Sequence, residues 1–273
     1  MKKTITLPVV LLVLATALFS ACKKNASSPK ETVLSKQYRN DKLATEYLYN
    51  NNKQVYQVNN YEPDGTLGAI TELEYDANGR LKTSTLINPN NGDDINQYLY
   101  TYNNKGEFQK SEYILLNGPD SGKVSTRTNY VYANNRISRA NEVNVTTGDI
   151  EWYHEYTYYA NGNLKTDNFY NNLTPVPELY SETEYTPEGD PLPLAYEPQN
   201  VYPVGIGLLI FVTANIHYTK YSGPAISQEY NESMSDRVFN NKGLITDQII
   251  TRKFKTPAFS DLVTTWNYEY IEL

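Results

Sequence analysis

Cysteine and histidine are almost absent from this 273-residue sequence, which contains one Cys and two His. A single Cys excludes a disulfide framework, a thiolate zinc site and an iron–sulfur cluster. His154 and His217 leave little material for a catalytic or metal centre built on imidazole. There is also no glycine-rich phosphate loop and no nucleophile-elbow motif. We therefore expect a protein that is not an enzyme and that has neither a cofactor nor a metal.

Basic side chains are outnumbered as well, because 24 Lys and Arg stand against 31 Asp and Glu and leave a net charge of −7. A nucleic-acid binder needs a basic footprint to neutralise phosphates, so nucleic acid is excluded as a partner. Tyrosine is abundant instead, with 26 Tyr against 7 Phe. Tyrosine fits the pleated, half-wet surface of a sheet, and this composition predicts an all-β protein.

The amino terminus has the pattern of a secretory signal. Lys2 and Lys3 form a short positive region, an apolar run extends from Ile5 to Phe19, and Ser20-Ala21-Cys22 follows. The run is shorter than the ~20 apolar residues that span a membrane. Small residues before a cleavage point are typical of exported proteins, so residues 1–21 are predicted to be a signal peptide.

The Cys directly after the small pair resembles the lipobox of bacterial lipoproteins, with Phe19 in place of the usual Leu. The resemblance implies cleavage between Ala21 and Cys22, acylation of Cys22 with palmitate among the lipids, and the membrane as a partner. Several acyl chains anchor a protein firmly, whereas one chain binds only reversibly. The alternative is an ordinary signal followed by an unrelated Cys. Residues 22–36 begin with a small, polar and basic stretch and are predicted to be a lipidated tether.

Lys23 bears on the location of the protein. In lipoproteins of enterobacterial type an Asp after the Cys retains the protein in the inner membrane, so Lys23 implies the outer membrane. Lipoproteins displayed on the surface of Bacteroidota often carry an acidic cluster there, which Lys23-Lys24-Asn25 lacks. A periplasmic face is therefore slightly favoured over the cell surface.

One motif recurs through the rest of the chain: an apolar or aromatic residue, any residue, Tyr, three mostly polar residues, Gly, any residue and then Leu, Ile or Phe. Its fullest copies are LEYDANGRL at 73–81, YTYNNKGEF at 100–108 and YTYYANGNL at 156–164. Internal repetition indicates an array of one supersecondary unit. The second aromatic residue recurs with a period near 27, at Tyr49, Tyr75, Tyr102, Tyr132, Tyr158, Tyr185 and Phe239.

Each unit is predicted to be a β-hairpin. The two rings of Tyr-x-Tyr point to one face because side chains alternate along a strand. DANG, NNKG and YANG supply Asn and Gly for tight turns, and alternating residues then form the returning strand. Seven or eight hairpins imply roughly 14 to 18 strands, and an open sheet rarely exceeds ~10 without curling. We expect residues 37–273 to form an antiparallel meander of ~27-residue hairpin repeats, as one elongated curved sheet or a wide barrel-like coil.

This pattern resembles YD repeats, the Tyr-Asp hairpins of Rhs-type shells, and more closely the short YD-like lipoproteins of Bacteroidota. The resemblance covers about residues 40–273, and Tyr75-Asp76 keeps the literal Tyr-Asp pair within the motif. It implies an architecture of stacked hairpins and says little about function. Rhs shells enclose a toxin domain, and that role is not implied for this chain.

A short apolar insertion interrupts the repeat near residues 201–216. It follows a proline-rich stretch at 191–200 and holds VYPVGIGLLIFVTANI. The favoured interpretation is a buried strand or short helix that covers an apolar face of the sheet. The alternatives are an exposed apolar patch for a partner protein or the membrane surface, and the floor of a ligand pocket.

The Tyr-rich face supplies the candidate ligand site. Its default role is structural, because aromatic cross-strand pairs stabilise a sheet by ~0.2–1 kcal/mol each. Tyrosines on a wet surface also suit sugar rings or a peptide, since the ring is apolar and the hydroxyl forms hydrogen bonds. The predicted platform consists of Tyr100, Tyr102, Tyr130, Tyr132, Tyr156 and Tyr158.

Two further sites have weaker support. Asp93-Asp94 and Asp120 offer oxygen ligands for calcium, but no calcium-loop pattern surrounds them, and turns require Asp and Asn anyway. His154 is expected to be a packed or surface histidine. A glycoside hydrolase would need two carboxylates at a defined separation. The candidates on expected strands, none of which stands out as a pair, are Glu151, Glu155, Glu182 and Glu184.

The leading hypothesis is a non-enzymatic, lipid-anchored cell-envelope protein whose β-repeat is a scaffold or binding surface. The alternative is a glycan-binding outer-membrane lipoprotein that uses its Tyr-rich face, and a hydrolase is a third hypothesis. Several rings exposed together on one concave face would favour glycan binding. Buried rings under a smooth polar surface would favour the scaffold.

Replacing Cys22 by Ala should abolish the incorporation of labelled palmitate, because the thiol that receives the diacyl group is gone. Metabolic labelling of cells that express the wild type and the Cys22→Ala variant, followed by immunoprecipitation, measures this. Substitution of the nearby Ser20 by Ala, which keeps a small residue, is the matched control and should retain the label. A variant without Cys22 that is still acylated would contradict the lipobox assignment.

Overall fold

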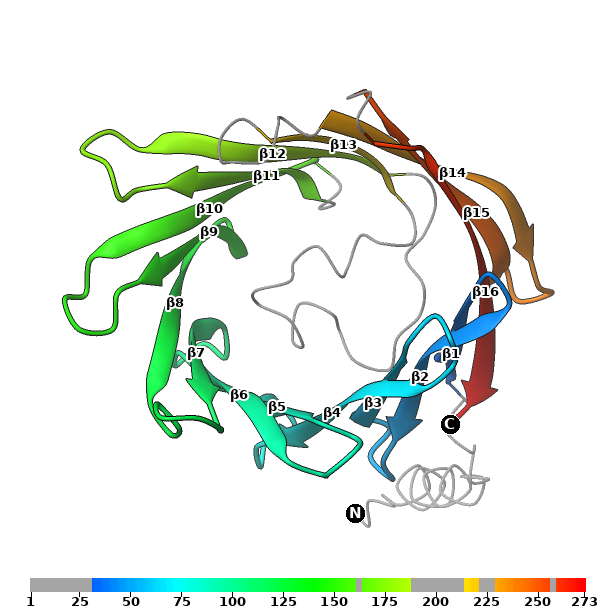
Figure 1. Ribbon diagram of the computed structural model, residues 1–273, viewed down its shortest axis with the longest axis horizontal. Coiled ribbons are helices and arrows are strands. Elements are labelled where there is room, and N and C mark those ends of the chain that lie inside the picture. The colour runs from blue at the N-terminus through cyan, green and yellow to red at the C-terminus, as the bar shows by residue number, and fades with distance from the viewer. Residues whose placement is uncertain (1–30, 161–163, 188–213, 221–228, 256–258) are drawn as a thin grey trace, which may run out of the picture.

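The computed structural model describes residues 31–160, 164–187, 214–220, 229–255 and 259–273, and in these ranges every regular element is a β-strand. The strands stand side by side in a ring (Figure 1). Their bounds are β1 (Thr32–Arg39), β2 (Lys42–Tyr49), β3 (Val55–Tyr61), β4 (Leu67–Tyr75), β5 (Leu81–Ile87), β6 (Asp94–Tyr102), β7 (Phe108–Leu115), β8 (Val124–Ala133), β9 (Arg136–Val143), β10 (Ile150–Tyr158), β11 (Leu164–Asn171), β12 (Glu178–Pro187), β13 (Ala214–Lys220), β14 (Glu229–Phe239), β15 (Ile245–Phe254) and β16 (Leu262–Glu272).

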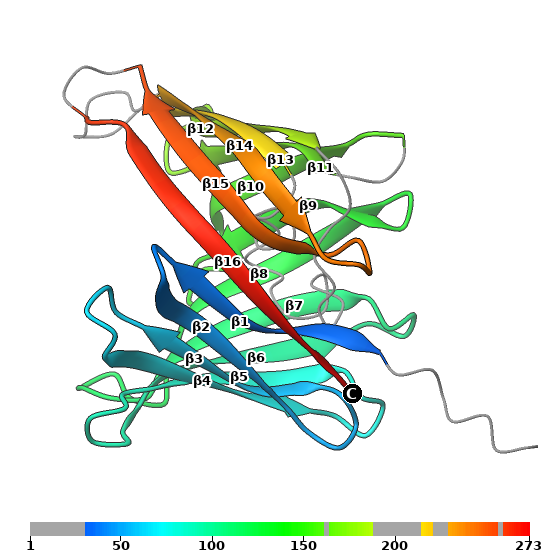
Figure 2. The same ribbon diagram turned by 90° about the vertical axis from the view of Figure 1, so that its right-hand side faces the viewer.

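The 16 strands form a closed barrel in which each strand pairs antiparallel with the next one along the chain. β16 then pairs with β1, from Thr32 opposite Glu272 to Arg39 opposite Trp266. Closure leaves no unpaired sheet edge among these strands. Figure 2 shows that the strands run obliquely to the barrel axis, as closure requires. The predicted all-β meander is thus confirmed, and it takes the closed form. No helix among the described residues is long and apolar enough to cross a membrane.

The structure moves the predicted end of the tether and describes only the last residues of the predicted apolar insertion. β1 begins at Thr32, so residues 32–36 of the predicted tether belong to the barrel. The reason is burial: Val33 and Leu34 are 0% and 1% exposed, and Leu34 packs in a cluster with Ile245 and Tyr268. Of the apolar insertion at 201–216, residues 201–213 lie outside the described residues, and Ala214 to Ile216 begin β13.

The repeat turn needs an Asp or Asn at its first position because that side chain closes the turn. Oδ1 of Asp76 accepts hydrogen bonds of 2.9 Å from the backbone N–H groups of Asn78 and Arg80. Asn103 makes the same two bonds with Lys105 and Glu107. Both bonds use only an acceptor oxygen, so Asn serves as well as Asp, which explains why the literal Tyr-Asp pair is rare. The Gly at the fourth position has positive φ, 82° at Gly106, which favours glycine.

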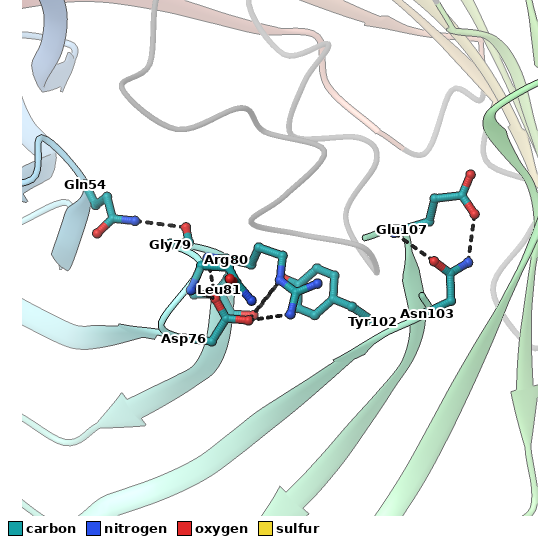
Figure 3. Close-up of polar contacts among 9 residues, drawn as sticks. Gln54, Asp76, Gly79, Arg80, Leu81, Tyr102, Asn103 and Glu107 are labelled. Atoms are coloured by element: carbon teal, nitrogen blue, oxygen red, sulfur yellow. Dashed lines mark hydrogen bonds and ion pairs between the residues drawn. The ribbon is translucent and has the colours of Figure 1, made fainter. Parts of the chain in front are cut away.

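The Tyr-x-Tyr rings face the interior of the barrel. Tyr102 lies on the inner side of the wall, against Arg80 from the preceding turn (Figure 3). Alternation along β6 puts Tyr100 on the same face as Tyr102, and the register with β7 adds its partners on that strand. This inner face holds most of the buried apolar side chains. Its buried core residues are Val55, Val58, Leu73, Leu81, Tyr100, Phe108, Tyr130, Ile137, Ala140, Tyr156, Leu164 and Tyr185.

The second Tyr of the motif joins each hairpin strand to the one before it. The Tyr102 hydroxyl donates a 2.7 Å hydrogen bond to the carbonyl of Leu81, the apolar residue that opens β5. Equivalent bonds join Tyr75 to Val55, Tyr158 to Ile137 and Tyr270 to Ile245, at 2.7, 2.7 and 2.8 Å. Tyr makes this bond where Phe could not, and Phe239, which holds the same position in β14, is 55% exposed.

The outer face of the wall is polar. Alternation places Glu112 outside, where it pairs with Lys110 at 3.0 Å and with Arg127 at 2.8 Å. Lys36 and Glu46 form a further outer pair at 3.9 Å between β1 and β2. Most of the aromatic core side chains thus face the interior, and charged side chains recur on the outside, where Tyr153 and Tyr170 also stack.

Replacing Tyr102 by Phe should lower the free energy of unfolding by about 1 kcal/mol, because the Leu81 carbonyl loses a hydrogen bond in a half-buried place. Urea unfolding followed by circular dichroism measures the change. Tyr56→Phe is the matched control, because that ring is 42% exposed, and it should leave the midpoint unchanged. Equal midpoints for the two variants would show that the tyrosine bond does not stabilise the barrel.

Candidate functional site

The six predicted platform tyrosines all lie on the inner face, but they are built into the wall. Tyr100, Tyr130 and Tyr156 are 8%, 8% and 6% exposed. Tyr130 forms a 3.0 Å hydrogen bond with Ser111, and the ring of Tyr102 stacks on Phe108 with centroids 4.8 Å apart. The half-buried members, which pack against the core, are Tyr102, Tyr132 and Tyr158. These rings therefore contact other wall residues over much of their surface.

Two residues before these buried core positions, further from the motif turns along the same inner face, several strands carry small polar residues. Thr45, Thr71 and Thr128 stand two residues before the paired aromatic or apolar positions of β2, β4 and β8. Ser84 and Ser111 face the core positions Leu73 and Tyr100 across β4–β5 and β6–β7. Small side chains therefore suffice at this level in several strands, whereas β6 and β7 carry Tyr98 and Tyr113 there, with ring centroids 5.0 Å apart.

Strands β10 to β12 carry rings at this level and again two residues beyond it. Their inner face carries four large rings, which we call the inner aromatic cluster: Trp152, His154, Phe169 and Tyr180. Trp152 and Phe169 are stacked with centroids 5.3 Å apart and planes 22° apart. Tyr180 stands at 90° to Trp152 and at 77° to Phe169, with centroids 5.7 and 5.6 Å away. The three rings form a corner, and each is only partly buried.

Charged groups surround this corner. His154 stacks on Phe169 at 4.4 Å, and its Nδ1 lies 2.7 Å from Oδ1 of Asp167. Lys220 places its ammonium 5.1 Å from the centroid of the Tyr180 ring. Glu142 pairs with Trp152 across β9 and β10. Burial raises the pKa of Glu142, and the nearby His154 partly opposes this shift. The cluster therefore joins aromatic surface to hydrogen-bond donors and acceptors.

A second inner group is satisfied within the wall. Glu232 is 6% exposed and accepts two hydrogen bonds from Arg252, at 3.0 and 2.8 Å. The guanidinium of Arg252 lies 4.4 Å from the centroid of Tyr230. Both charges have partners inside the wall, so this pair fits a structural role.

The carboxylates considered for hydrolysis project from the outer face. Glu151 accepts a 2.8 Å hydrogen bond from the Asn144 side chain, and Glu155 lies 3.7 Å from Arg139. Glu182 and Glu184 lie on the same outer face in β12, where they pair with outer residues of β11. Their placement gives them no shared interior cleft.

The acidic loops considered for calcium form turns between strands. Asp93 accepts a 2.7 Å hydrogen bond from the side chain of Asn91, and Asp120 pairs with Lys123 at 2.8 Å. In the part of the chain that the structure describes, no group of three or more His, Cys, Asp and Glu side chains is placed to hold a metal ion. Ala21 and Cys22 lie outside the described residues.

Sequence reasoning missed the inner aromatic cluster because Phe169 and Tyr180 lie outside the repeat motif. The available signal was alternation: Trp152 and His154 share a face with Tyr156 and Tyr158 on one strand. The partners on β11 and β12 depend on cross-strand register, which places Phe169 opposite His154.

No family model matches the sequence, and no curated protein does. Several solved structures do match. A porin-like protein from Bacteroides uniformis is 12% identical with a TM-score of 0.50, over 90% of this chain and 94% of that chain. A porin-like protein from Bacteroides vulgatus is 13% identical with a TM-score of 0.47, over 88% and 100%. The TcdB2-TccC3 structure is 15% identical with a TM-score of 0.34, over 81% of this chain and 10% of that chain. At these identities the likeness concerns the fold alone.

The barrel should lose stability at high pH because its inner tyrosines are held protonated. Burial raises the pKa of Tyr132 and of Tyr158 to about 12, and that of Tyr156 well above its usual range. In the unfolded chain a tyrosine has a pKa of ~10. The stabilisation from the protonated tyrosines is therefore complete below pH ~10, and it is lost as the pH rises through their folded-state pKa values.

A titration followed by phenolate absorbance and circular dichroism tests this. Tyrosine rings that are exposed to solvent should ionise first with the fold intact, and the buried rings should ionise together with unfolding. Ionisation of all tyrosines in one step near pH ~10, without loss of structure, would contradict the inner placement.

Proposed function

We propose that this chain is a lipid-anchored, non-enzymatic protein of the bacterial cell envelope, and that its barrel is a water-exposed binding vessel. The observation that carries the proposal is the outer face of the wall, which carries charged side chains in the middle of its strands. A barrel embedded in a membrane has the opposite arrangement, with an outward apolar band about 25 Å tall and a polar interior.

The outer charges lie where such a barrel would contact lipid. Glu46, Glu112 and Glu155 stand near the middle of β2, β7 and β10. Charged side chains on the lipid face cost up to ~2–4 kcal/mol each at the bilayer midplane. The described strands repeat such charges around the ring, and this supports a wall that faces water on both sides. We therefore do not extend the porin-like character of the structural neighbours to this chain.

A barrel whose outer face contacts water needs a separate attachment to be held at a membrane, and the lipobox at Cys22 supplies one. We place the protein at the outer membrane, facing the periplasm. The second candidate function is that of a glycan-binding outer-membrane lipoprotein. The concave, Tyr-lined interior favours it, because an apolar ring with a hydroxyl tip suits a sugar.

Replacing residues 1–22 by a cleavable secretory signal without a Cys should release the protein into the soluble periplasmic fraction. The described barrel begins at Glu31 and closes without any residue before it. Fractionation and immunoblotting measure the release, and the native chain is the control that stays with membranes. A variant that is folded but remains in the membrane, and is extracted only by detergent, would mean that the barrel itself spans the bilayer.

A further inference from the structure

We propose that the inner aromatic cluster binds one pyranose ring of an oligosaccharide, with Trp152 as its main contact. The inference deepens the glycan-binding candidate and rests on the interior being open to water. The proposed site consists of the corner of Trp152, Phe169 and Tyr180, together with the flanking groups of His154, Asp167, Glu142 and Lys220.

The cluster goes beyond what the repeat requires. The position of Trp152, four residues before the core residue of its strand, holds Ala69, Asn96 and Thr126 in β4, β6 and β8, and the wall pairs past them in the same antiparallel way. The position of His154, two residues before the core residue, holds Thr71 and Thr128 in β4 and β8 and Tyr98 in β6. Behind the cluster, Tyr156 is already buried to 6% exposure and supplies the core contact of β10. The rings of Trp152 and Tyr180 are partly exposed in addition to that core. Large apolar rings left partly exposed on a concave wall need another reason to be there.

The shape of the corner fits a sugar ring. The planes of Trp152 and Phe169 differ by 22°, and Tyr180 stands at 90° to Trp152. A pyranose has one face of C–H groups that stacks on an aromatic plane and an edge that contacts a perpendicular ring. A flat aromatic wall would offer only the first of these contacts, so the perpendicular Tyr180 gives the site a defined end.

The charges around the corner favour a sugar over an apolar ligand. Asp167 and His154 are joined at 2.7 Å on one side, and Glu142 lies opposite Trp152. An apolar ligand would cover these groups without bonding to them, which costs free energy. Sugar hydroxyls both donate and accept, so they can bond to the carboxylates and to His154. Lys220 already occupies the cation position over Tyr180, which disfavours a cationic ligand.

Tryptophan fluorescence gives a direct test because the chain has two Trp residues, Trp152 in the site and Trp266 in β16. Trp266→Phe leaves Trp152 as the sole reporter, and Trp152→Phe leaves Trp266. Both variants, otherwise full-length and acylated, are solubilised in detergent. They are titrated with cellohexaose, maltohexaose, xylohexaose, mannohexaose and chitohexaose.

At least one of these sugars should change the Trp152 emission with saturation and leave the Trp266 emission unchanged. In calorimetry of the chain with both Trp residues, Trp152→Ala should weaken binding of that sugar at least about tenfold, equivalent to ~1.4 kcal/mol. Trp152→Phe should fall between wild type and Ala, because a smaller ring remains. Thermal unfolding shows whether each variant is folded. If Trp152→Ala is not folded, Trp152→Phe provides the comparison with the wild type.

Tyr98→Ala is the matched control, because Tyr98 is a partly buried inner ring of another sector, 5.0 Å from Tyr113. It should leave binding unchanged. The proposal is overturned if no sugar changes the Trp152 emission, or if Tyr98→Ala and Trp152→Ala weaken binding equally. Neither result affects the anchored-vessel proposal, which depends on fractionation alone.

Discussion

The hydrogen bond from the second motif tyrosine to the strand before it sets the step from one hairpin to the next. Tyr102 reaches the carbonyl of Leu81, and Tyr158 reaches that of Ile137, with the same geometry. Apolar residues at the start of several odd strands, such as Val55, Leu81 and Leu164, pack in the same core cluster as the rings. One contact therefore recurs in many of the hairpin units of the wall. A lone hairpin is marginal in water, and this contact lets neighbouring hairpins stabilise one another.

The hairpin unit could be predicted from sequence because its causes are local. Asp76 and Gly79 define the turn, and the alternation of Tyr100 with Tyr102 defines the face. Closure could not be predicted, because the pairing of Thr32 with Glu272 joins the two ends of the described barrel. The boundary at Thr32 was missed for the same reason, since Leu34 is buried in a cluster with Ile245 and Tyr268 from the far end of the chain. The aromatic cluster depends on register across three strands, which sequence spacing does not give.

On the inner face, the position along the strand separates the tyrosines that the fold uses from the rings of the proposed sugar site. At the level of the turns, rings such as Tyr130 are buried and bonded, and their chemistry is used by the fold. Further from the motif turns along the strands, small side chains suffice in several units, so the sequence can vary. Trp152 and its neighbours lie at these positions. The repeat can thus change its interior in one sector without changing its architecture.

The closure of the barrel also gives it a direction relative to its attachment. Glu31 and Leu273 are joined by a backbone hydrogen bond, and Tyr49 bonds to Leu34, so both chain ends and the Asp76–Arg80 type of turn share one rim. With the chain held at Cys22, at most about nine linking residues of ~3.6 Å each separate the bilayer from that rim. Under the proposed anchoring at Cys22, this rim lies toward the membrane. The opposite rim, formed by loops such as 88–93 and 172–177, then faces away from it.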